Sequence, residues 1–180
     1  MLKTAAFFLA ATLAATPLIA QPSAFHSGPA ITEFGAVAPV EMTMAIPPNA
    51  SFAVAFDTST RADAGEINRT FDSAARFINM HVAAGVPAEN IRVAVVVHGG
   101  ASLDLTNSDF YAARQDGAEN ANVAAIETLL ANDVRIILCG QSAAYHEIGV
   151  GDLVPGVEMA LSAMTAHALL QQQGSTLNPF

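Results

Sequence analysis

The chain is poor in cysteine, and Cys139 is the only one. A single thiol cannot form a disulfide within the chain, so packing alone has to stabilise the fold. An odd cysteine is either buried and inert, paired between chains, or kept for its reactivity. Any prediction about chemistry therefore depends on Cys139.

Positive charge is also scarce, because the 180 residues include 7 Lys and Arg against 16 Asp and Glu. The formal net charge of −9 repels phosphate backbones, and the basic residues form no cluster. Nucleic acid is therefore excluded as an expected partner.

Several common catalytic and metal-binding patterns are missing. Without GxSxG, P-loop or GxGxxG patterns, serine hydrolysis, nucleotide hydrolysis and dinucleotide binding have no support. A CxxC pair and an HExxH motif are missing as well, so we expect no metal site and no cofactor. The two methionines of EMTMA, at 41–45, are too few to predict copper binding, and a hydrophobic contact is their expected use.

The longest apolar run lies at the start of the chain. Lys3, the apolar residues 5–13 and the small residues 14–16 have the layout of a secretory signal peptide. The run is shorter than the roughly 20 residues that span a bilayer, which favours a cleaved signal over an uncleaved anchor. We expect removal of residues 1–20, with cleavage after Ala24 as the alternative. A bacterial periplasm is the expected location, without membrane insertion after cleavage.

Proline marks the next segment. Residues 21–50 contain five prolines and few charges, which indicates an extended arm rather than a packed core element. Within this arm, residues 34–40 are a candidate edge strand. The remaining residues, 51–180, have a suitable length for a single domain with its own core.

From residue 51 onward, strand-like and helix-like patterns alternate. Short apolar runs predict strands at 51–56, 91–97 and 134–138, and the last two are the β-branched runs typical of strands buried on both faces. Helical spacing predicts helices at 67–82, 123–130 and 159–173, and weaker patterns predict short strands at 153–157 and 175–180. This alternation predicts an α/β three-layer sandwich with a mostly parallel sheet of about five strands, similar to flavodoxin.

Polar or reactive residues follow each of the three central strands. Ligands of open parallel sheets bind at the carboxyl ends of the strands, where the connecting loops converge. We therefore predict that the functional residues gather at this edge. The candidate catalytic residues are Cys139 and His98, and the candidate binding residues are Asp57, Gly99, Gly100, Gly140 and Gln141.

Cys139 has two open interpretations. It stands where a strand ends and a helical turn begins, so free N–H groups of that turn can lower its pKa and favour the nucleophilic thiolate. It can equally be the last core residue of the strand, since free cysteine is often buried. His98 either supplies a proton or stabilises a thiolate, or it only bonds to backbone. His146, seven residues after Cys139, either lies near it or faces solvent.

The chain reads VAVVVHGGASLDL from residue 93, VRIILCGQS from residue 134 and LVPGVEMALSAMTAHALLQQQGSTLNPF from residue 153. Over residues 51–180 this pattern resembles the DsrE/DsrF-like family, in particular its exported branch. The resemblance implies a small α/β domain, often assembled into trimers or hexamers, whose better-known cytosolic members pass sulfane sulfur along a relay. In those members a cysteine after the third strand carries the persulfide, and only Cys139 matches that position.

Two functions remain open. The first is a periplasmic sulfur carrier or transferase that forms a persulfide on Cys139, assisted by His98, with a protein or a small sulfur compound as donor and acceptor. The second is a non-catalytic oligomeric module that binds a small ligand, with Cys139 in its core or pocket wall. The apolar content of 52% and the low charge of the helix at 157–170 favour a homo-oligomer in either case.

Overall fold

One parallel sheet organises the molecule. The structure is a computed structural model that describes residues 24–178, so the expected signal peptide at 1–20 lies outside the described residues. Five strands pair in the order β4-β3-β2-β1-β5, and every pair is parallel. They are β1 Phe52–Thr58, β2 Ile91–Val97, β3 Arg135–Cys139, β4 Glu158–Ala160 and β5 Thr176–Asn178. The predicted α/β fold with a five-stranded parallel sheet is confirmed.

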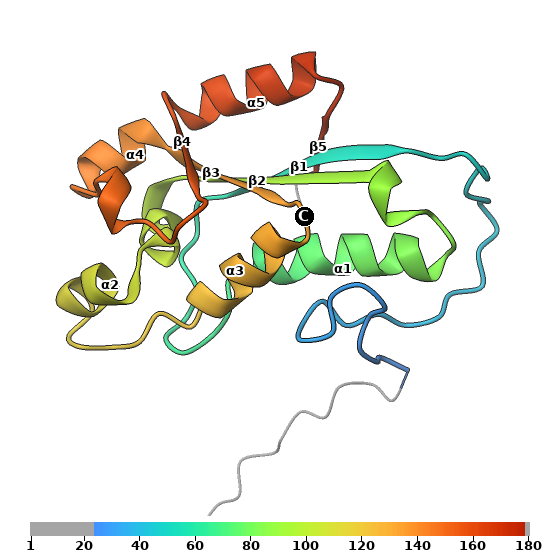
Figure 1. The fold of residues 1–180 in the computed structure, drawn as a ribbon, viewed down its shortest axis with the longest axis horizontal. Helices are drawn as coiled ribbons and strands as arrows, with labels where there is room; N and C mark the ends of the chain where they lie inside the picture. Colours follow the sequence, from blue (N-terminus) through green and yellow to red (C-terminus); the bar gives the residue numbers. More distant parts are fainter. Residues whose placement is uncertain (1–23, 179–180) are drawn as a thin grey trace, which may run out of the picture.

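The helices cover both faces of the sheet (Figure 1). They are α1 Arg69–Ala83, α2 Ser108–Arg114, α3 Val123–Ala131, α4 Gly140–Tyr145 and α5 Ala163–Gln172, with 3-10 helices η1 Ala88–Asn90, η2 Gly99–Leu105 and η3 Val150–Asp152. Helices α1 and α3 lie on one face, and α5 lies on the other. None of the helices within residues 24–178 has the length and apolarity needed to cross a membrane.

The position of α5 follows from the strand order. Strands β1 to β4 are added in one direction across the sheet, and β5 then returns to pair with β1. Because crossovers between parallel strands are right-handed, the returning crossover has to place α5 on the opposite face. The order differs from the flavodoxin order 2-1-3-4-5. The strand order reverses at β1. Open α/β sheets bind ligands at the carboxyl ends of the strands beside such a reversal.

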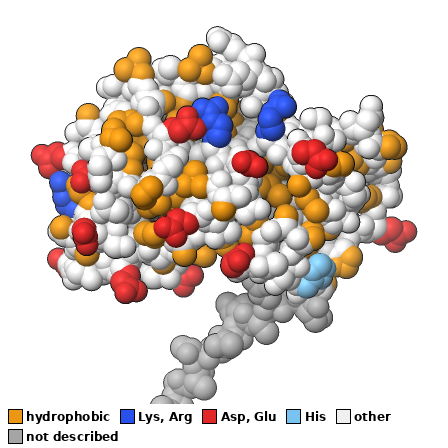
Figure 2. All heavy atoms as spheres, in the orientation of Figure 1, with side chains coloured by type: hydrophobic (Ala, Val, Ile, Leu, Met, Phe, Trp, Pro, Cys, Tyr) orange, Lys and Arg blue, Asp and Glu red, His pale blue; other side chains and the backbone are white. Residues whose placement is uncertain are grey.

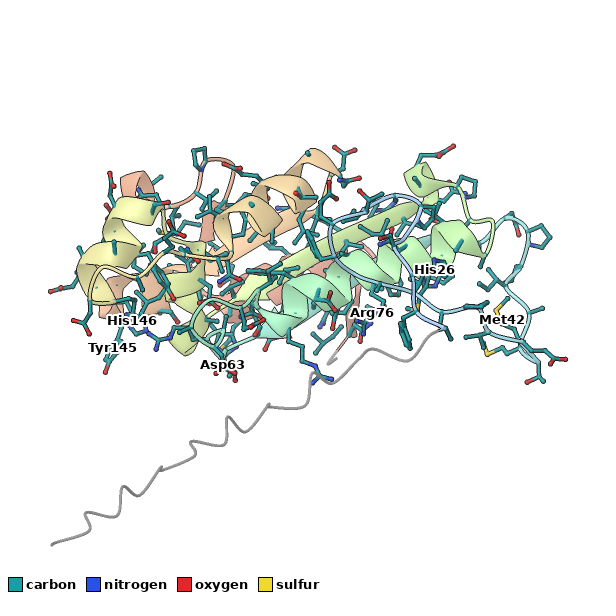
Figure 3. All side chains as sticks on the ribbon, turned by 90° about the horizontal axis from the view of Figure 1, so that it is seen from below. His26, Met42, Asp63, Arg76, Tyr145 and His146 are labelled. Carbon is teal, nitrogen blue, oxygen red and sulfur yellow. The ribbon has the colours of Figure 1, made fainter. Side chains whose placement is uncertain are left out.

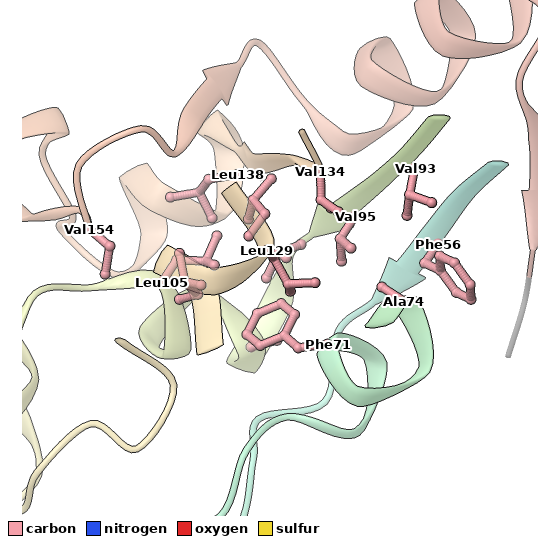
Figure 4. Packing of buried hydrophobic residues seen from close by; sticks show 14 of the residues in the cluster. Phe56, Phe71, Ala74, Val93, Val95, Leu105, Leu129, Val134, Leu138 and Val154 are labelled. Atoms are coloured by element: carbon pink, nitrogen blue, oxygen red, sulfur yellow. The ribbon is translucent and has the colours of Figure 1, made fainter. Parts of the chain in front are cut away.

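The alternation of side chains along the strands creates two cores. The larger core, under α1 and α3, includes Phe56, Phe71, Val95 and Leu138 (Figure 4). The smaller core, under α5, consists of short side chains from three strands and two residues of the helix: Ala55, Ala94, Val96, Ile137, Ala166 and Leu170. Because successive strand residues point to opposite faces, the residues that follow Phe56, Val97 and Leu138 point towards α5.

Two predicted elements near the end of the chain are wrong. The strand predicted at 153–157 is replaced by β4 at Glu158–Ala160, and Leu153 makes only an isolated bridge with Thr106. Pro155 has no N–H to donate, and Gly156 turns the chain with a φ of 97°, so pairing cannot start earlier. The helix predicted at 159–173 begins only at Ala163, because the Ser162 hydroxyl caps it by accepting the N–H of Thr165.

The arm packs more closely than its proline content indicates. Ile31 and Val37 are buried, and Ile31 belongs to the larger core, so the prediction that the arm lies outside the core is wrong. The side chain of Asn79 on α1 holds it: Oδ1 accepts the N–H of Ile31 at 2.9 Å, and Nδ2 donates to the carbonyls of Ile31 and Gly35 at 2.8 and 3.0 Å. The edge strand predicted at 34–40 is also wrong, because Val37 forms only an isolated bridge with His26. A single buried amide side chain thus replaces the pairing of a strand.

We expect Asn79→Ala to lower the free energy of unfolding by about 2 to 4 kcal/mol, because backbone groups of the arm lose their buried partners. The arm should also become sensitive to limited proteolysis. Urea denaturation and digestion followed by mass spectrometry measure both effects. Asn132→Ala is the matched control, since the Asn132 amide donates to a carbonyl at an exposed position. An Asn79→Ala protein with unchanged stability and an intact arm would contradict this account of the packing.

Candidate functional site

The register of the sheet brings three predicted residues to one edge. Val97 of β2 pairs with Thr58 of β1 and with Leu138 of β3. The N–H of His98 donates to the Thr58 carbonyl at 2.9 Å, which extends this ladder by one residue. His98 therefore lies at the level of Cys139 on the neighbouring strand, and the two backbones are one strand spacing of about 5 Å apart. Both point towards α5.

Asp57 joins two histidines on this face. Its Oδ2 lies 3.1 Å from Nε2 of His98, and its Oδ1 lies 2.7 Å from Nε2 of His167, which α5 contributes. Burial opposes ionisation of Asp57, but the hydrogen bonds from His167 and then His98 outweigh it, so the pKa of Asp57 is lowered from its ordinary value. The carboxylate therefore fixes the orientation of both imidazoles. His167 was not predicted from the sequence, although it is the only ionisable residue of α5, which was a signal for it.

The lowered pKa of Asp57 has a consequence for stability. A depressed folded-state pKa adds stability above the unfolded value near 3.8, and this stability is lost as the pH falls through the folded pKa. We expect Asp57→Asn to lose less stability than the wild type when the pH falls below about 4. The side chain is 36% exposed, which limits the difference to under about 1 kcal/mol.

Urea denaturation across pH measures this difference. Asp63→Asn removes an exposed carboxylate and serves as the control for the change in net charge. If the free energy of unfolding falls equally for the wild type and Asp57→Asn as the pH is lowered, the two histidines do not stabilise the carboxylate.

Cys139 is the last residue of β3 and the N-cap of α4, and only 6% of its surface is exposed. The thiol makes no close capping hydrogen bond, but backbone N–H groups of both adjoining helices approach the sulfur. Burial raises the pKa of the thiol, while the N–H and hydroxyl of Ser142, then the N–H groups of Ala163 and Gln141, lower it below the ordinary value. Since Ala163 begins α5, the sulfur lies between the starts of α4 and α5.

Ser142 connects Cys139 to the loop after β2. Its Oγ accepts the N–H of Gly99 at 2.9 Å, which leaves the hydroxyl hydrogen free to donate to the sulfur. Gly99 has a φ of 53°, and a Cβ there would lie 3.2 Å from the carbonyl oxygen of Ser59. Ser142 was not among the residues predicted from the sequence. Its position three residues after the N-cap, where helix N–H groups face the cap, was the available signal.

A family comparison adds to this geometry. The model of the DsrE/DsrF-like family matches residues 50–179. The chain belongs to the DsrE/DsrF-like family. No match was found among curated proteins.

Two solved structures are similar to this DsrE/DsrF-like chain. The first is the protein of unknown function MTH1491 from Methanobacterium thermoautotrophicum, with a TM-score of 0.49 and 17% identity over 72% of this chain and 100% of that one. The second is the ychN protein from E. coli, with a TM-score of 0.46 and 16% identity over 72% of this chain and 99% of that one.

The other predicted residues of this DsrE/DsrF-like site have different surroundings. Gly140 packs against backbone, since a Cβ there would lie 2.5 Å from the carbonyl oxygen of Ala160. Gln141 is exposed and donates to the carbonyl of Leu161, while Gly100 is exposed and offers no side chain. Nε2 of His146 lies 3.0 Å from the carbonyl oxygen of Gly99, beside the loop after β2.

A cavity of about 370 Å³ opens beside the carboxyl end of β1. Its lining includes Arg61 and Arg69 as well as Asp63 and Glu66, so the charges of the two signs balance, and Asn68 adds an amide. Residues 24–178 contain no group of three or more His, Cys, Asp or Glu side chains that could hold a metal ion. The described edge of the sheet therefore offers a thiol with a lowered pKa at the end of β3 and a polar pocket at the end of β1.

Proposed function

We propose that this DsrE/DsrF-like protein is an exported sulfur carrier that holds a persulfide on Cys139. The observation that carries the proposal is the position of the thiol between the starts of two helices, where its pKa is lowered. A persulfide needs such a site because the thiolate is the form that attacks sulfane sulfur. Membership of a family linked to sulfur relay supports the same conclusion.

The reaction needs a persulfide or polysulfide as donor. The Cys139 thiolate attacks the outer sulfur of R–S–SH, the new S–S bond forms as the S–S bond of the donor breaks, and R–S⁻ leaves, which gives Cys139–S–SH. An acceptor thiolate then attacks the outer sulfur of this persulfide, takes it over, and restores the Cys139 thiolate. Atoms and charge balance in both steps without an additional oxidant or reductant.

His98 assists by protonating the departing thiolate. Asp57 holds its Nε2, so the ring keeps a fixed orientation at the level of Cys139. The side chain of His98 is about one-third exposed, which lets it reach a donor that approaches from solvent. Ser142 stabilises the Cys139 thiolate before loading and after the sulfur has been passed on.

The low exposure of Cys139 requires a movement during loading. The segment between β4 and α5 borders the sulfur, and Leu161 and Met164 in and beside this segment are exposed. A small displacement of this segment opens the site to a sulfur compound or to a partner thiol. Exposed apolar side chains here and along α5 also support assembly into a homo-oligomer.

A second candidate is a non-catalytic module that binds a small ligand. Two observations favour it: only 6% of Cys139 is exposed, and a cavity at the end of β1 is lined by polar and charged side chains of both signs, among them Arg61 and Asp63. In this function the ligand is a small polar molecule in that cavity, and Cys139 serves as a packed core residue.

Alkylation of the native protein lacking residues 1–20 distinguishes the two functions. Labelling is followed by intact mass across pH, before and after incubation with polysulfide. A sulfur carrier gives a single fast alkylation with a midpoint below the free-cysteine value of about 8.5, and sulfur mass that a reductant removes. Protection from alkylation until denaturant is added would overturn the carrier proposal and favour the binding module.

Ser142→Ala tests the source of the thiol's acidity. We expect its alkylation midpoint to rise by roughly half a unit to one unit, because a hydrogen bond to a charged group is worth about 1 kcal/mol or more. Ser175→Ala is the control, since Ser175 lies beyond the end of α5. Equal alkylation midpoints for the wild type and Ser142→Ala would show that Ser142 does not lower the pKa of the Cys139 thiol.

A further inference from the structure

A second group of potential ligands lies where the arm crosses the C-terminal half of α1. A mainly apolar cavity of about 480 Å³ is lined by both segments, and its donor side chains are Met42 from the arm and Met80 and His81 from α1. Figure 3 shows Met42 at the opposite end of the molecule from His146, so this cavity is separate from the end that carries Cys139. We propose that Met42, Met80 and His81 bind a soft monovalent cation, Cu(I) or Ag(I).

His81 is already arranged as a metal ligand. Its Nδ1 lies 2.7 Å from the carbonyl oxygen of Phe77, and a carbonyl only accepts, so Nδ1 carries the hydrogen and Nε2 presents a lone pair. Metal-binding histidines commonly donate their other ring nitrogen in this way, which fixes the tautomer. The rings of Phe52 and Phe77 pack against the imidazole, with centroids 4.3 and 4.2 Å away. Metal binding to the neutral ring therefore requires neither a change of tautomer nor reorientation of the ring.

The two thioethers determine which cation fits. Met42 and Met80 are 53% and 44% exposed, so both border the cavity and remain accessible from solvent. Thioether and imidazole together suit Cu(I), whereas Mg²⁺ and Ca²⁺ require oxygen ligands. The described lining contains no carboxylate, which disfavours the harder cations. The chain as a whole has a formal net charge of −9, and acidic side chains are more frequent than basic ones on the face shown in Figure 2, so the protein attracts cations in general.

This site alters the interpretation of the EMTMA segment. Two methionines alone were too few to predict copper binding, and a hydrophobic contact was the expected use. The fold supplies Met80 and His81 from a distant part of the sequence. Asn79, the residue before Met80, holds the arm against α1 at Ile31 and Gly35, and the arm then brings Met42 to the same cavity. The complete donor set therefore exists only in the folded chain.

Titration with Ag(I), which needs no redox control, tests the proposal. The test uses the Cys139→Ser background, because the free thiol would compete for the metal. We expect one equivalent to bind, with shifts of the methyl resonances of Met42 and Met80 in protein labelled with ¹³C-methyl methionine. Met42→Leu combined with Met80→Leu keeps the side-chain volume and should weaken binding at least tenfold. Met164→Leu, on the exposed surface of α5, should bind as the background protein does.

Three results would overturn the site: no binding at micromolar Ag(I), unchanged affinity in the double leucine variant, or equal shifts of Met42, Met159 and Met164. Circular dichroism and urea denaturation of the double variant establish that it remains folded. A Cu(I) competition titration against a coloured chelator, run on the same proteins, checks that the silver result extends to copper. If the protein binds Ag(I) but takes no Cu(I) from the chelator, the site is specific for the silver probe and the copper assignment is overturned.

Discussion

Replacing Cys139 with Ser is expected to abolish sulfur loading completely. The chain has no other thiol, and a serine hydroxyl at this position neither ionises near neutral pH nor forms a stable bond to sulfane sulfur. Intact mass after incubation with polysulfide should show no mass that a reductant removes. The wild-type protein treated in parallel should gain one or more sulfur atoms.

The free energy of unfolding of Cys139→Ser is the control, because it shows that lost loading does not result from unfolding. Cys139 is mostly buried, and a hydroxyl in its place keeps the approach of the N–H groups of Ser142 and Ala163, so we expect a loss of no more than about 1 kcal/mol. Asp57→Ala offers a second comparison, since it frees His98 while leaving the thiol in place. We expect it to slow transfer to an acceptor thiol and still permit loading. Loading that persists in Cys139→Ser would place the sulfur chemistry at another residue.

The central strands were predictable because their signal is local. Apart from Arg92 and Arg135 near their starts, the runs at 91–97 and 134–138 consist of β-branched and other apolar residues without alternation, as expected for strands with helices on both faces, and they form most of β2 and β3. Strand β4 gave no such signal, because two of its three residues are exposed at the edge of the sheet. The packing of the arm was also invisible, since it depends on one amide, Asn79, from a helix far along the chain.

The site was predictable in part for the same reason. Asp57, His98 and Cys139 each follow a recognisable strand, and in a parallel sheet all strand ends meet at one edge. The residues that tune these groups come from elements whose position depends on the whole topology. His167 reaches Asp57 because α5 crosses back over the sheet, and the N–H of Ala163 reaches the thiol for the same reason. Neither contact has a spacing in the sequence that reveals it.

The start of α5 therefore controls the environment of the thiol, and Gly140 is the residue that allows it to come close. A Cβ on Gly140 would lie 2.5 Å from the carbonyl oxygen of Ala160 and 3.2 Å from that of Leu161. Both atoms belong to the backbone, so they cannot move aside as a side chain would. Gly140→Ala has to displace the segment between β4 and α5, and with it the N–H of Ala163.

We expect Gly140→Ala to lower the free energy of unfolding by about 2 to 3 kcal/mol, as overpacking against backbone usually does. The alkylation midpoint of Cys139 should rise, because the thiolate loses an N–H partner, while the rate at high pH should increase, because the sulfur is more exposed. Urea denaturation and pH-dependent alkylation measure the two effects on one protein.

Gly151→Ala is the matched control for Gly140→Ala. A Cβ at Gly151 meets no atom within 4 Å, so this substitution should leave both stability and alkylation close to those of the wild type. The pattern of changes also separates the two candidate functions. Faster alkylation together with faster sulfur loading in Gly140→Ala means that the segment limits access to a reactive thiol. Faster alkylation without any loading means that Cys139 is a packed residue that the substitution has merely uncovered.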